Sequence, residues 1–380
     1  MPTFAMKVYD LQWFTTFGMS YDEAAESLVA DGIDTVLTQN QIDPLPNSGV
    51  DQRDYLASFG NRLTTYTDDA WVTTLRKHGL RVVQTSAVFF DPPSLERYSD
   101  ACPIDADGRA QVPFDWYLGI CPTHEAHLAE KIAKLRRVVA ELQPSALFLQ
   151  FFRYPGFWEN WTWSPDYVFS NRDRFCFCDR CRSAFAHDLS IALPAGDFAT
   201  QVTHILSNHA EAWTDWRCRR IADVAARIRS TVIPEQPQMS IMLNTLPFPA
   251  SDFNRQNARR EYAAQDLSLL APYIERFELM TYLQILNRPI SWITPAVLDA
   301  KLSLPEGREV VCTLQVDALY TDGVHRDRQR APEVDAAEIE AAAFKALDAG
   351  ADGLVFYHWT DFLQDVSGSK RAALRRITGV

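Results

Sequence analysis

Three cysteines lie within six residues of one another, Cys176, Cys178 and Cys181, in the pattern C-x-C-x-x-C. This spacing is too dense for an ordinary disulfide framework, and the chain has an odd number of cysteines, seven in all. Clustered thiolates favour a tetrahedral Zn²⁺ ion, which requires a fourth ligand. We predict a structural zinc ion held by these three residues and Cys121, because four thiolates leave no position for substrate. The alternative fourth ligands are His124 and Cys102, and the alternative to a metal is a set of reduced core cysteines.

Two carboxylates are placed where they could act together on a glycosidic bond. Glu159 is the first acid after a central apolar run, and an aromatic pocket formed by Trp158 and Trp161 would raise its pKa, as a general acid requires. Asp317 ends a later apolar run and fits a nucleophile or base. Glycoside hydrolysis generally uses two such carboxyl groups. We therefore predict Asp317 and Glu159 as the catalytic pair. The acids that could replace Glu159 are Asp10, Asp91 and Asp361.

Aromatic and polar residues recur at the ends of the apolar runs. Sugar rings have apolar faces, so aromatic side chains stack on them while polar groups bind the hydroxyls. The predicted substrate-binding residues are Asp10, Asn40, Gln150, Arg153, Tyr154, Trp158, Tyr282, His358, Trp359 and Asp361. The loop 154–163 carries five aromatic residues, so we expect it to form a pocket wall with Trp158 as a stacking platform. The alternative is that these rings only fill space between the loop and the barrel.

Apolar runs and helical segments alternate along the chain. Eight runs are predicted strands, at residues 5–11, 33–38, 80–90, 146–152, 238–243, 277–283, 309–316 and 353–357. The main helices are predicted at residues 21–30, 68–78, 122–142, 209–228, 258–273, 293–302 and 332–347. Ser20 and Glu23 fit a capping box at the start of the first helix. Parallel strands buried on both faces read as continuous apolar runs, so the pattern predicts an α/β fold, a (β/α)₈ TIM barrel. Active sites of such barrels lie at the C-terminal strand ends.

The bulk properties fit one large soluble unit. We predict a single barrel domain over residues 1–380, with long βα loops at 91–120 and 153–205; the 380 residues are 47% hydrophobic. A net charge of −12 without a basic patch argues against nucleic-acid binding. No apolar run reaches membrane-spanning length and no signal-peptide core opens the chain, so we expect a cytoplasmic protein without membrane contact. The expected partner is a small-molecule carbohydrate, and self-association into a homo-oligomer is compatible with the sequence.

The segment from Cys121 to Phe185 resembles bacterial β-galactosidases that carry zinc in a TIM barrel. It contains, in order, a Cys-Pro pair at Cys121, a long helix ending at Leu142, a strand beginning at Ala146, and FCFCDRCRSAF, which ends at Phe185. The resemblance implies a barrel with a zinc site and glycosidase activity. In those enzymes a Glu acid/base, preceded by Asn, ends the fourth strand; here the equivalent positions are near Arg153.

A second resemblance comes from the stretch LQFFRYPGFWE, which is similar to glycosidase-like proteins whose fourth strand reads Leu-Asp-x-Ile-Arg-Tyr-Pro. The stretch YLQILNRPISWI, from Tyr282, fits the same group, although Gln150 stands where that group has Asp. The leading hypothesis is a glycoside hydrolase. One alternative is a non-hydrolytic or degenerate sugar-binding barrel, motivated by Gln150. Another is a lyase or isomerase that acts on a sugar derivative with His358 or Tyr282 as acid or base.

Overall fold

The computed structural model describes residues 2–46, 65–114, 116–161 and 167–380, and its centre is a closed barrel of eight parallel strands. The strands follow chain order around the barrel: β1 (Thr3–Val8), β2 (Thr35–Thr38), β3 (Arg81–Ala87), β4 (Ala146–Gln150), β5 (Ser240–Thr245), β6 (Arg276–Thr281), β7 (Glu309–Gln315) and β8 (Gly353–Tyr357). β8 pairs with β1, which closes the barrel. The predicted TIM-barrel fold is therefore confirmed.

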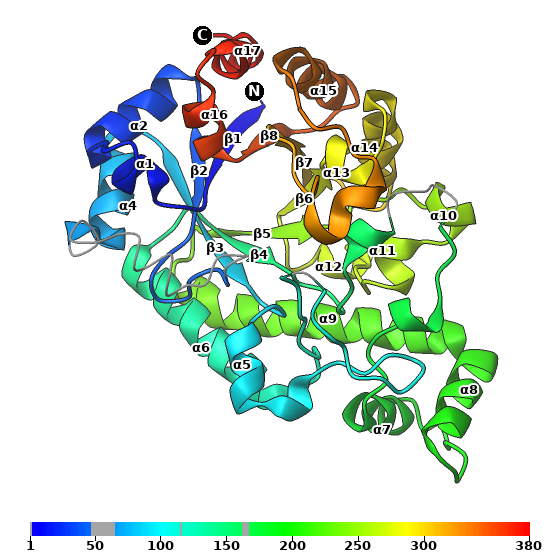
Figure 1. Cartoon of the computed structure of the whole chain (residues 1–380). Helices are drawn as coiled ribbons and strands as arrows, with labels where there is room; N and C mark the ends of the chain where they lie inside the picture. The colour runs from blue at the N-terminus through cyan, green and yellow to red at the C-terminus, as the bar shows by residue number, and fades with distance from the viewer. Residues whose placement is uncertain (1, 47–64, 115, 162–166) are drawn as a thin grey trace.

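Helices surround the barrel, and further short helices lie in its loops. They are α1 (Gln12–Thr15), α2 (Tyr21–Ala30), α4 (Asp68–Lys77), α5 (Pro92–Arg97), α6 (Glu125–Leu142), α7 (Asp179–Asp188), α8 (Phe198–Asn208), α9 (Ala210–Val232), α10 (Asp252–Arg255), α11 (Ala258–Glu261), α12 (Leu267–Leu270), α13 (Leu283–Leu286), α14 (Ile293–Leu302), α15 (Ala336–Asp348), α16 (Trp359–Gln364) and α17 (Ser369–Thr378). Figure 1 shows α7 and α8 outside the ring, beyond α9.

The strands are buried on both faces, as their continuous apolar character predicts. The inward side chains form a small interior cluster made of Ala5, Leu37, Val83, Ala146, Phe148, Met242, Val311 and Val355. The outward side chains join a much larger core between the barrel and the helices, to which Met6, Leu147 and Leu279 belong.

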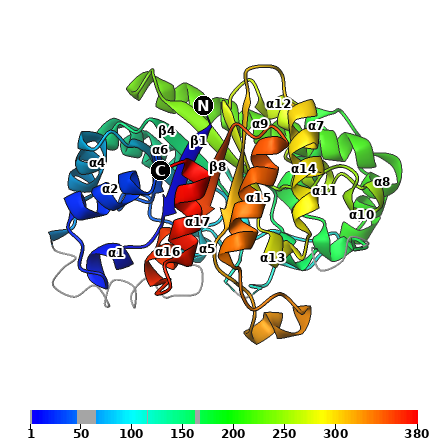
Figure 2. The ribbon, with the colours of Figure 1, turned by 90° about the horizontal axis from the view of Figure 1, so that it is seen from above.

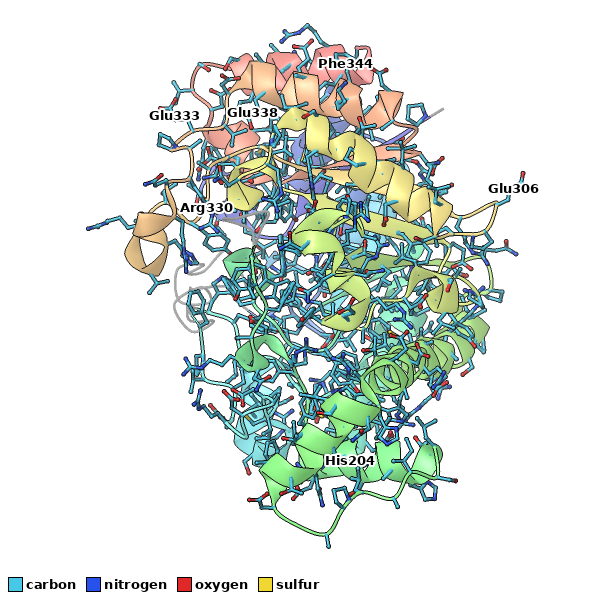
Figure 3. All side chains as sticks on the ribbon, turned by 90° about the vertical axis from the view of Figure 1, so that its right-hand side faces the viewer. His204, Glu306, Arg330, Glu333, Glu338 and Phe344 are labelled. Carbon is cyan, nitrogen blue, oxygen red and sulfur yellow. The ribbon has the colours of Figure 1, made fainter. Side chains whose placement is uncertain are left out.

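The loops that follow the strands gather at one end of the barrel. In Figure 2, α1, α13 and α16, which follow β1, β6 and β8, lie at the same end, and the N-terminus lies at the other. Figure 3 shows the same polarity: Arg330, just after the 3₁₀ helix η7 (Gly323–Arg328), and Glu306, in the turn before β7, lie at opposite ends. No described helix is long and apolar enough to cross a membrane.

Two helix predictions show how local and tertiary signals compete. The capping box of Ser20 and Glu23 is present at α2. The helix predicted over residues 258–273 is wrong, since only the short α11 and α12 form there. Ala264 between them has a positive φ of 57°. The break lets the Gln265 side chain donate to the carbonyl oxygens of Phe152 and Asn244, at 3.2 and 2.9 Å.

A charged pair lies inside the barrel. Lys7 on β1 and Glu278 on β6 form an ion pair with a 2.5 Å Nζ–Oε1 distance, and their side chains are 1% and 0% exposed. Asn244 donates to the other Glu278 oxygen at 2.5 Å, and the Thr313 hydroxyl also donates to Glu278. Burial lowers the pKa of Lys7, and Glu278 opposes that shift. The pair connects two strands across the interior.

Lys7→Met should destabilise the protein, because it leaves the Glu278 carboxylate buried without its cation. Breaking a buried pair costs about 3–5 kcal/mol of unfolding free energy, measurable by urea denaturation. The double variant Lys7→Met/Glu278→Leu should be more stable than the single variant. Lys77→Met, at an exposed surface lysine, is the control and should change little. A wild-type unfolding midpoint for Lys7→Met would contradict this account.

Candidate functional site

A cavity of about 330 Å³ opens at the end of the barrel where the strand-following loops gather. Its lining includes residues on or after β1 (Lys7, Tyr9, Asp10, Gln12), β2 (Gln39, Leu45, Pro46), β3 (Phe90, Trp116), β4 (Gln150, Phe151, Arg153, Trp158, Glu159), β5 (Asn244), β6 (Met280, Tyr282, Ile285), β7 (Leu319, Tyr320) and β8 (Tyr357, His358). Ligand sites of TIM barrels lie at this end. The cavity is therefore the candidate functional site.

The floor of the cavity is polar. Gln150 at the end of β4 donates its side-chain amide to the Tyr9 hydroxyl at 2.5 Å. The Lys7 ammonium lies 3.4 Å from the Tyr282 hydroxyl and 5.5 Å from the centre of the Tyr357 ring. Burial raises the pKa of Tyr9 and Tyr282 well above the usual value, so both phenols stay neutral. Neutral phenols, an amide and an ammonium are suited to hydrogen bonding with hydroxyl groups.

Aromatic rings form much of the remaining wall. Trp158 packs with its ring nearly parallel to that of Tyr282, at a centroid distance of 6.4 Å. Trp116 donates its indole N–H to the Tyr320 hydroxyl at 3.0 Å, which connects the loops after β3 and β7. The other aromatic residues of the lining are Tyr9, Phe90, Phe151 and Tyr357. Such surfaces match the apolar faces of sugar rings.

Four side chains of the cavity carry or can carry a full charge besides Lys7. The Thr360 hydroxyl donates its one proton to the Asp10 carboxylate, and its oxygen lies 2.7 and 2.9 Å from the two carboxylate oxygens. Glu159 comes from the 3₁₀ helix η3 (Trp158–Asn160) and is 6% exposed. Arg153 and His358 complete the set. The structure thus brings seven of the predicted site residues to the cavity: Glu159, Asp10, Gln150, Arg153, Trp158, Tyr282 and His358.

Asp317 and Asp361 lie outside the cavity lining. The Asp317 carboxylate is 49% exposed and pairs with Lys370 of α17 at 2.9 Å, so it turns toward the helical layer. Asp361 accepts the backbone N–H of His358 at 3.1 Å and lies 3.6 Å from the Nδ1 atom of that histidine. Burial raises the pKa of Asp361. Asp361 therefore orients a cavity residue instead of facing the cavity itself.

Three further predicted binding residues also lie behind the wall. Asn40 is buried and donates to Gln84 at 3.2 Å. Trp359 is 1% exposed and packs against other rings of the helical layer. Tyr154 is equally buried, with the Arg217 guanidinium 5.3 Å from its ring centre, and borders the cysteines instead of the cavity. Their positions differ from the prediction because a side chain near a strand end can also pack against the surrounding layer instead of facing the cavity.

The sequence predictions missed Lys7, Tyr9 and Tyr357 as cavity residues. They also missed Glu278, the partner of Lys7. A signal for the charged pair was present, because a lysine and a glutamate each interrupt an otherwise apolar strand. Buried charges of this kind are rare unless paired, which would have identified both strands as neighbours of a polar floor.

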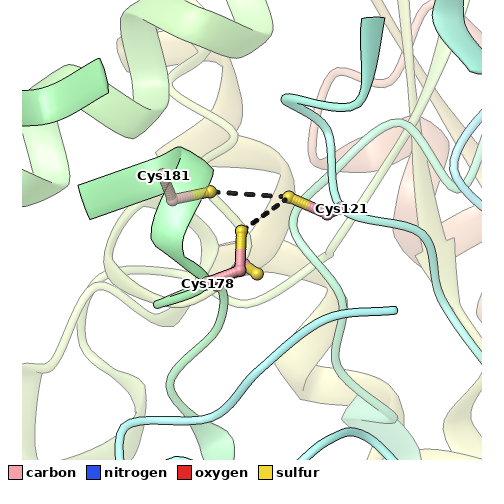
Figure 4. Close-up of side chains that lie close together, drawn as sticks. Cys121, Cys178 and Cys181 are labelled. Atoms are coloured by element: carbon pink, nitrogen blue, oxygen red, sulfur yellow. Dashed lines mark hydrogen bonds between the residues drawn. The ribbon is translucent and has the colours of Figure 1, made fainter. Parts of the chain in front are cut away.

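The four predicted metal ligands come together. The Sγ atoms of Cys121, Cys176, Cys178 and Cys181 all lie within 4.8 Å of one another. Cys121 is 3.7 Å from Cys178 and 3.4 Å from Cys181, sulfur to sulfur, and Figure 4 shows these sulfurs pointing toward each other. These distances are too long for disulfide bonds. The cluster could hold a metal ion.

The surroundings of the cysteine cluster suit a metal centre. The backbone N–H of Ile104 donates to the Cys176 sulfur at 3.3 Å, and the Thr123 hydroxyl lies 3.1 Å from the Cys121 sulfur. Burial raises the pKa of Cys176 and Cys181, so thiolates here need a nearby cation. The cluster connects Cys121, at the end of the segment 91–120, with the segment 153–205. The two segments also meet at a bridge between Asp105 and Phe175.

Comparisons with solved structures find the same fold in glycoside hydrolases. A β-galactosidase from the haloarchaeon Halorubrum lacusprofundi is 12% identical with a TM-score of 0.67, over 99% of this chain and 57% of that one. The β-galactosidase of Marinomonas ef1 is 10% identical with a TM-score of 0.66, over 98% of this chain and 58% of that one. The glycoside hydrolase domain of PgaB (BpsB) from Bordetella bronchiseptica is 14% identical with a TM-score of 0.64, over 100% and 99%.

These similarities establish the fold and agree with the β-galactosidase resemblance of the sequence. The chain spans somewhat more than half the length of the two β-galactosidases. No protein-family model and no curated protein sequence matches the chain. The class defined by fold and neighbours is thus a TIM barrel of the kind found in glycoside hydrolases.

Trp158 and Trp161 form a matched pair for testing the aromatic wall. Trp158 lines the cavity, whereas Trp161 packs on Phe169 and Tyr262 and donates to Asp173. Trp158→Ala should weaken sugar binding by roughly 1–3 kcal/mol, a side-chain-burial estimate, in a ligand titration. Trp161→Ala should lower the melting temperature and leave affinity unchanged. Unchanged affinity in both variants would show that both rings only pack. Of the two other aromatic residues of this loop not yet placed, Phe157 packs against Phe114 and Trp116, and Trp163 lies outside the described residues.

Proposed function

We propose that this protein is a glycoside hydrolase that binds a carbohydrate in the cavity at the C-terminal end of the barrel. The observation that carries the proposal is the combination in one cavity of an aromatic wall with the carboxylates of Asp10 and Glu159. Two carboxyl groups and an apolar sugar platform are what glycosidic bond cleavage generally requires. The fold shared with glycoside hydrolases supports the same class.

In this proposal Glu159 is the general acid. It would donate its proton to the glycosidic oxygen as the bond to the anomeric carbon breaks, and the departing alcohol would carry that proton away. A second carboxylate would attack the anomeric carbon or remove a proton from the attacking water. Asp317 is the second carboxylate predicted from the sequence, and its pairing with Lys370 makes Asp10, inside the cavity, the alternative.

A non-hydrolytic sugar-binding barrel is the second candidate. It is favoured by Gln150, an amide at the end of β4, and by the half-exposed position of Asp317. A panel of aryl glycosides separates the two functions, because a binding protein releases no aryl alcohol. The predicted cytoplasmic location, the single-domain organisation and self-association stay predictions.

We further propose that the cysteine cluster holds one structural zinc ion. Zn–S bonds of about 2.3 Å in a tetrahedron place sulfur atoms about 3.8 Å apart. The 3.4 and 3.7 Å separations from Cys121 are close to that value. Four thiolates fill the coordination shell, so the ion would stabilise the loops and take no part in the chemistry.

Glu159→Gln should lower turnover of a glycoside with a poor leaving group, such as an alkyl glycoside, by about 10²–10⁴-fold, because such an alcohol needs the acid's proton to depart and the amide cannot donate it. Asp317→Asn and Asp10→Asn, assayed beside it, identify the second carboxylate by the larger loss. Glu306→Gln, at the opposite end of the barrel in Figure 3, is the control for loss of one negative charge. Full activity in the Glu159 variant would exclude this acid.

Elemental analysis should find about one zinc ion per chain. Cys181→Ala should lose the ion and lower the melting temperature, because the loops lose their cross-link. Cys218→Ala is the matched control, since Cys218 is equally buried but lies outside the cluster. Metal-free protein with an unchanged melting temperature would contradict a structural role.

A further inference from the structure

Arg153 differs from the other buried arginines of the described residues. These arginines are Arg153, Arg182, Arg217, Arg259 and Arg288. The other four have protein partners: Arg182 and Arg217 donate to backbone carbonyls, and Arg259 and Arg288 pair with aspartates. Arg153 is 3% exposed, yet it makes no hydrogen bond and no ion pair with any residue that the structure describes. Its five N–H donors therefore have no protein acceptor there.

The guanidinium group of Arg153 lies at the cavity, which it helps to line. It packs over the Phe151 ring at 5.3 Å from the ring centre. The backbone on either side is held in place, because Phe152 accepts from Gln265 at 3.2 Å and Tyr154 donates to Ala263 at 2.9 Å. The backbone that carries Arg153 is thus held in place, and the guanidinium contacts the Phe151 ring without a salt bridge to any described residue.

The charged groups around the cavity differ in whether they have a counter-ion. The Lys7 ammonium already has the carboxylate of Glu278 at 2.5 Å. The two carboxylates that line the cavity, Asp10 and Glu159, do not pair with Arg153 within 4.0 Å. None of the Arg153 nitrogens is among the fully buried atoms without a partner, so the guanidinium is open to the cavity. A largely buried cation without a counter-ion favours a ligand that supplies the anion.

We infer that the carbohydrate bound here is an acidic sugar, whose carboxylate is held by Arg153. The planar guanidinium matches the two coplanar oxygens of a carboxylate and can donate two parallel N–H···O bonds to them. The aromatic wall would hold the ring of the same uronic acid residue. This inference rests on the proposed function for the choice of a sugar, but it concerns binding and does not require turnover.

Calorimetric titration of the whole chain tests the inference. The probes are methyl glucosiduronate and methyl galactosiduronate, with the neutral methyl glucoside and methyl galactoside beside them. At least one uronate should bind about tenfold or more tightly than its neutral counterpart, because its carboxylate accepts charge-assisted hydrogen bonds that the neutral sugar cannot form. Equal or tighter binding of the neutral sugars would overturn the inference, as would tighter binding of galactose 6-sulfate than of either uronate.

Two Arg153 variants and one control assign the preference to this residue. Arg153→Met should lose the uronate preference by about 10- to 100-fold, and Arg153→Lys, which keeps the charge without the planar fork, should retain part of it. Arg137→Met, at an exposed arginine of α6, removes the same charge and should leave the preference unchanged. Retention of the full preference by folded Arg153→Met, or by Arg153→Lys and Arg153→Met alike, would overturn the assignment.

The outcomes also separate this inference from the proposed function. Uronate binding that depends on Arg153, without cleavage of any aryl glucuronide or galacturonide, would contradict the proposed hydrolase function and support the inferred acidic ligand. Cleavage of neutral aryl glycosides without uronate binding would support the proposed hydrolase function and contradict the inferred acidic ligand.

Discussion

A charge placed inside a closed barrel must be neutralised where it lies, and the pair of Lys7 and Glu278 meets that constraint. Lys7 reaches across the interior from β1 to Glu278 on β6, where Asn244 and Thr313 supply further donors. This interaction places polar groups in the barrel interior beside the apolar interior cluster. It also forms part of the cavity floor, because Lys7 and Asn244 themselves line the cavity.

The walls depend on a different constraint, the need to hold long loops in place. The segments 91–120 and 153–205 supply Trp116, Trp158, Glu159 and Arg153 to the cavity. The cysteine cluster joins Cys121, which directly follows the first segment, to the C-x-C-x-x-C cysteines of the second. A metal ion there would hold both loops against the barrel without contacting a ligand in the cavity. The cysteine cluster would thus stabilise the loops, while the residues that line the cavity would bind the ligand.

Much of the fold could be predicted, because its signals are local or repeated. The eight apolar runs specify buried parallel strands, and the spacing of Cys176, Cys178 and Cys181 specifies a cluster. The fourth cysteine, Cys121, was predicted from the Cys-Pro pair that precedes the long helix, as in the β-galactosidase resemblance, with Cys102 and His124 as alternatives. The break of the helix predicted over residues 258–273 was not predictable, since it serves the contacts of Gln265 with distant strand ends.

The site could be predicted only in part, because side-chain direction depends on partners far along the chain. Asp317 follows a strand, as a catalytic carboxylate would. Its carboxylate nevertheless pairs with Lys370 of the helical layer, which lies 53 residues later in the chain. Lys7 and Glu278 are 271 positions apart, so the sequence shows a charge inside each apolar strand but not that the two charges pair. Arg153 was expected to bind substrate, but its lack of a protein partner among the described residues appears only in three dimensions.

A crystal structure with a bound methyl uronoside tests the central claim most directly, that this cavity is the sugar site. The account predicts electron density for the sugar in the cavity, with its ring against Trp158 and its carboxylate within hydrogen-bonding distance of Arg153. Density for the sugar elsewhere on the protein, with the cavity filled only by water, would contradict the account.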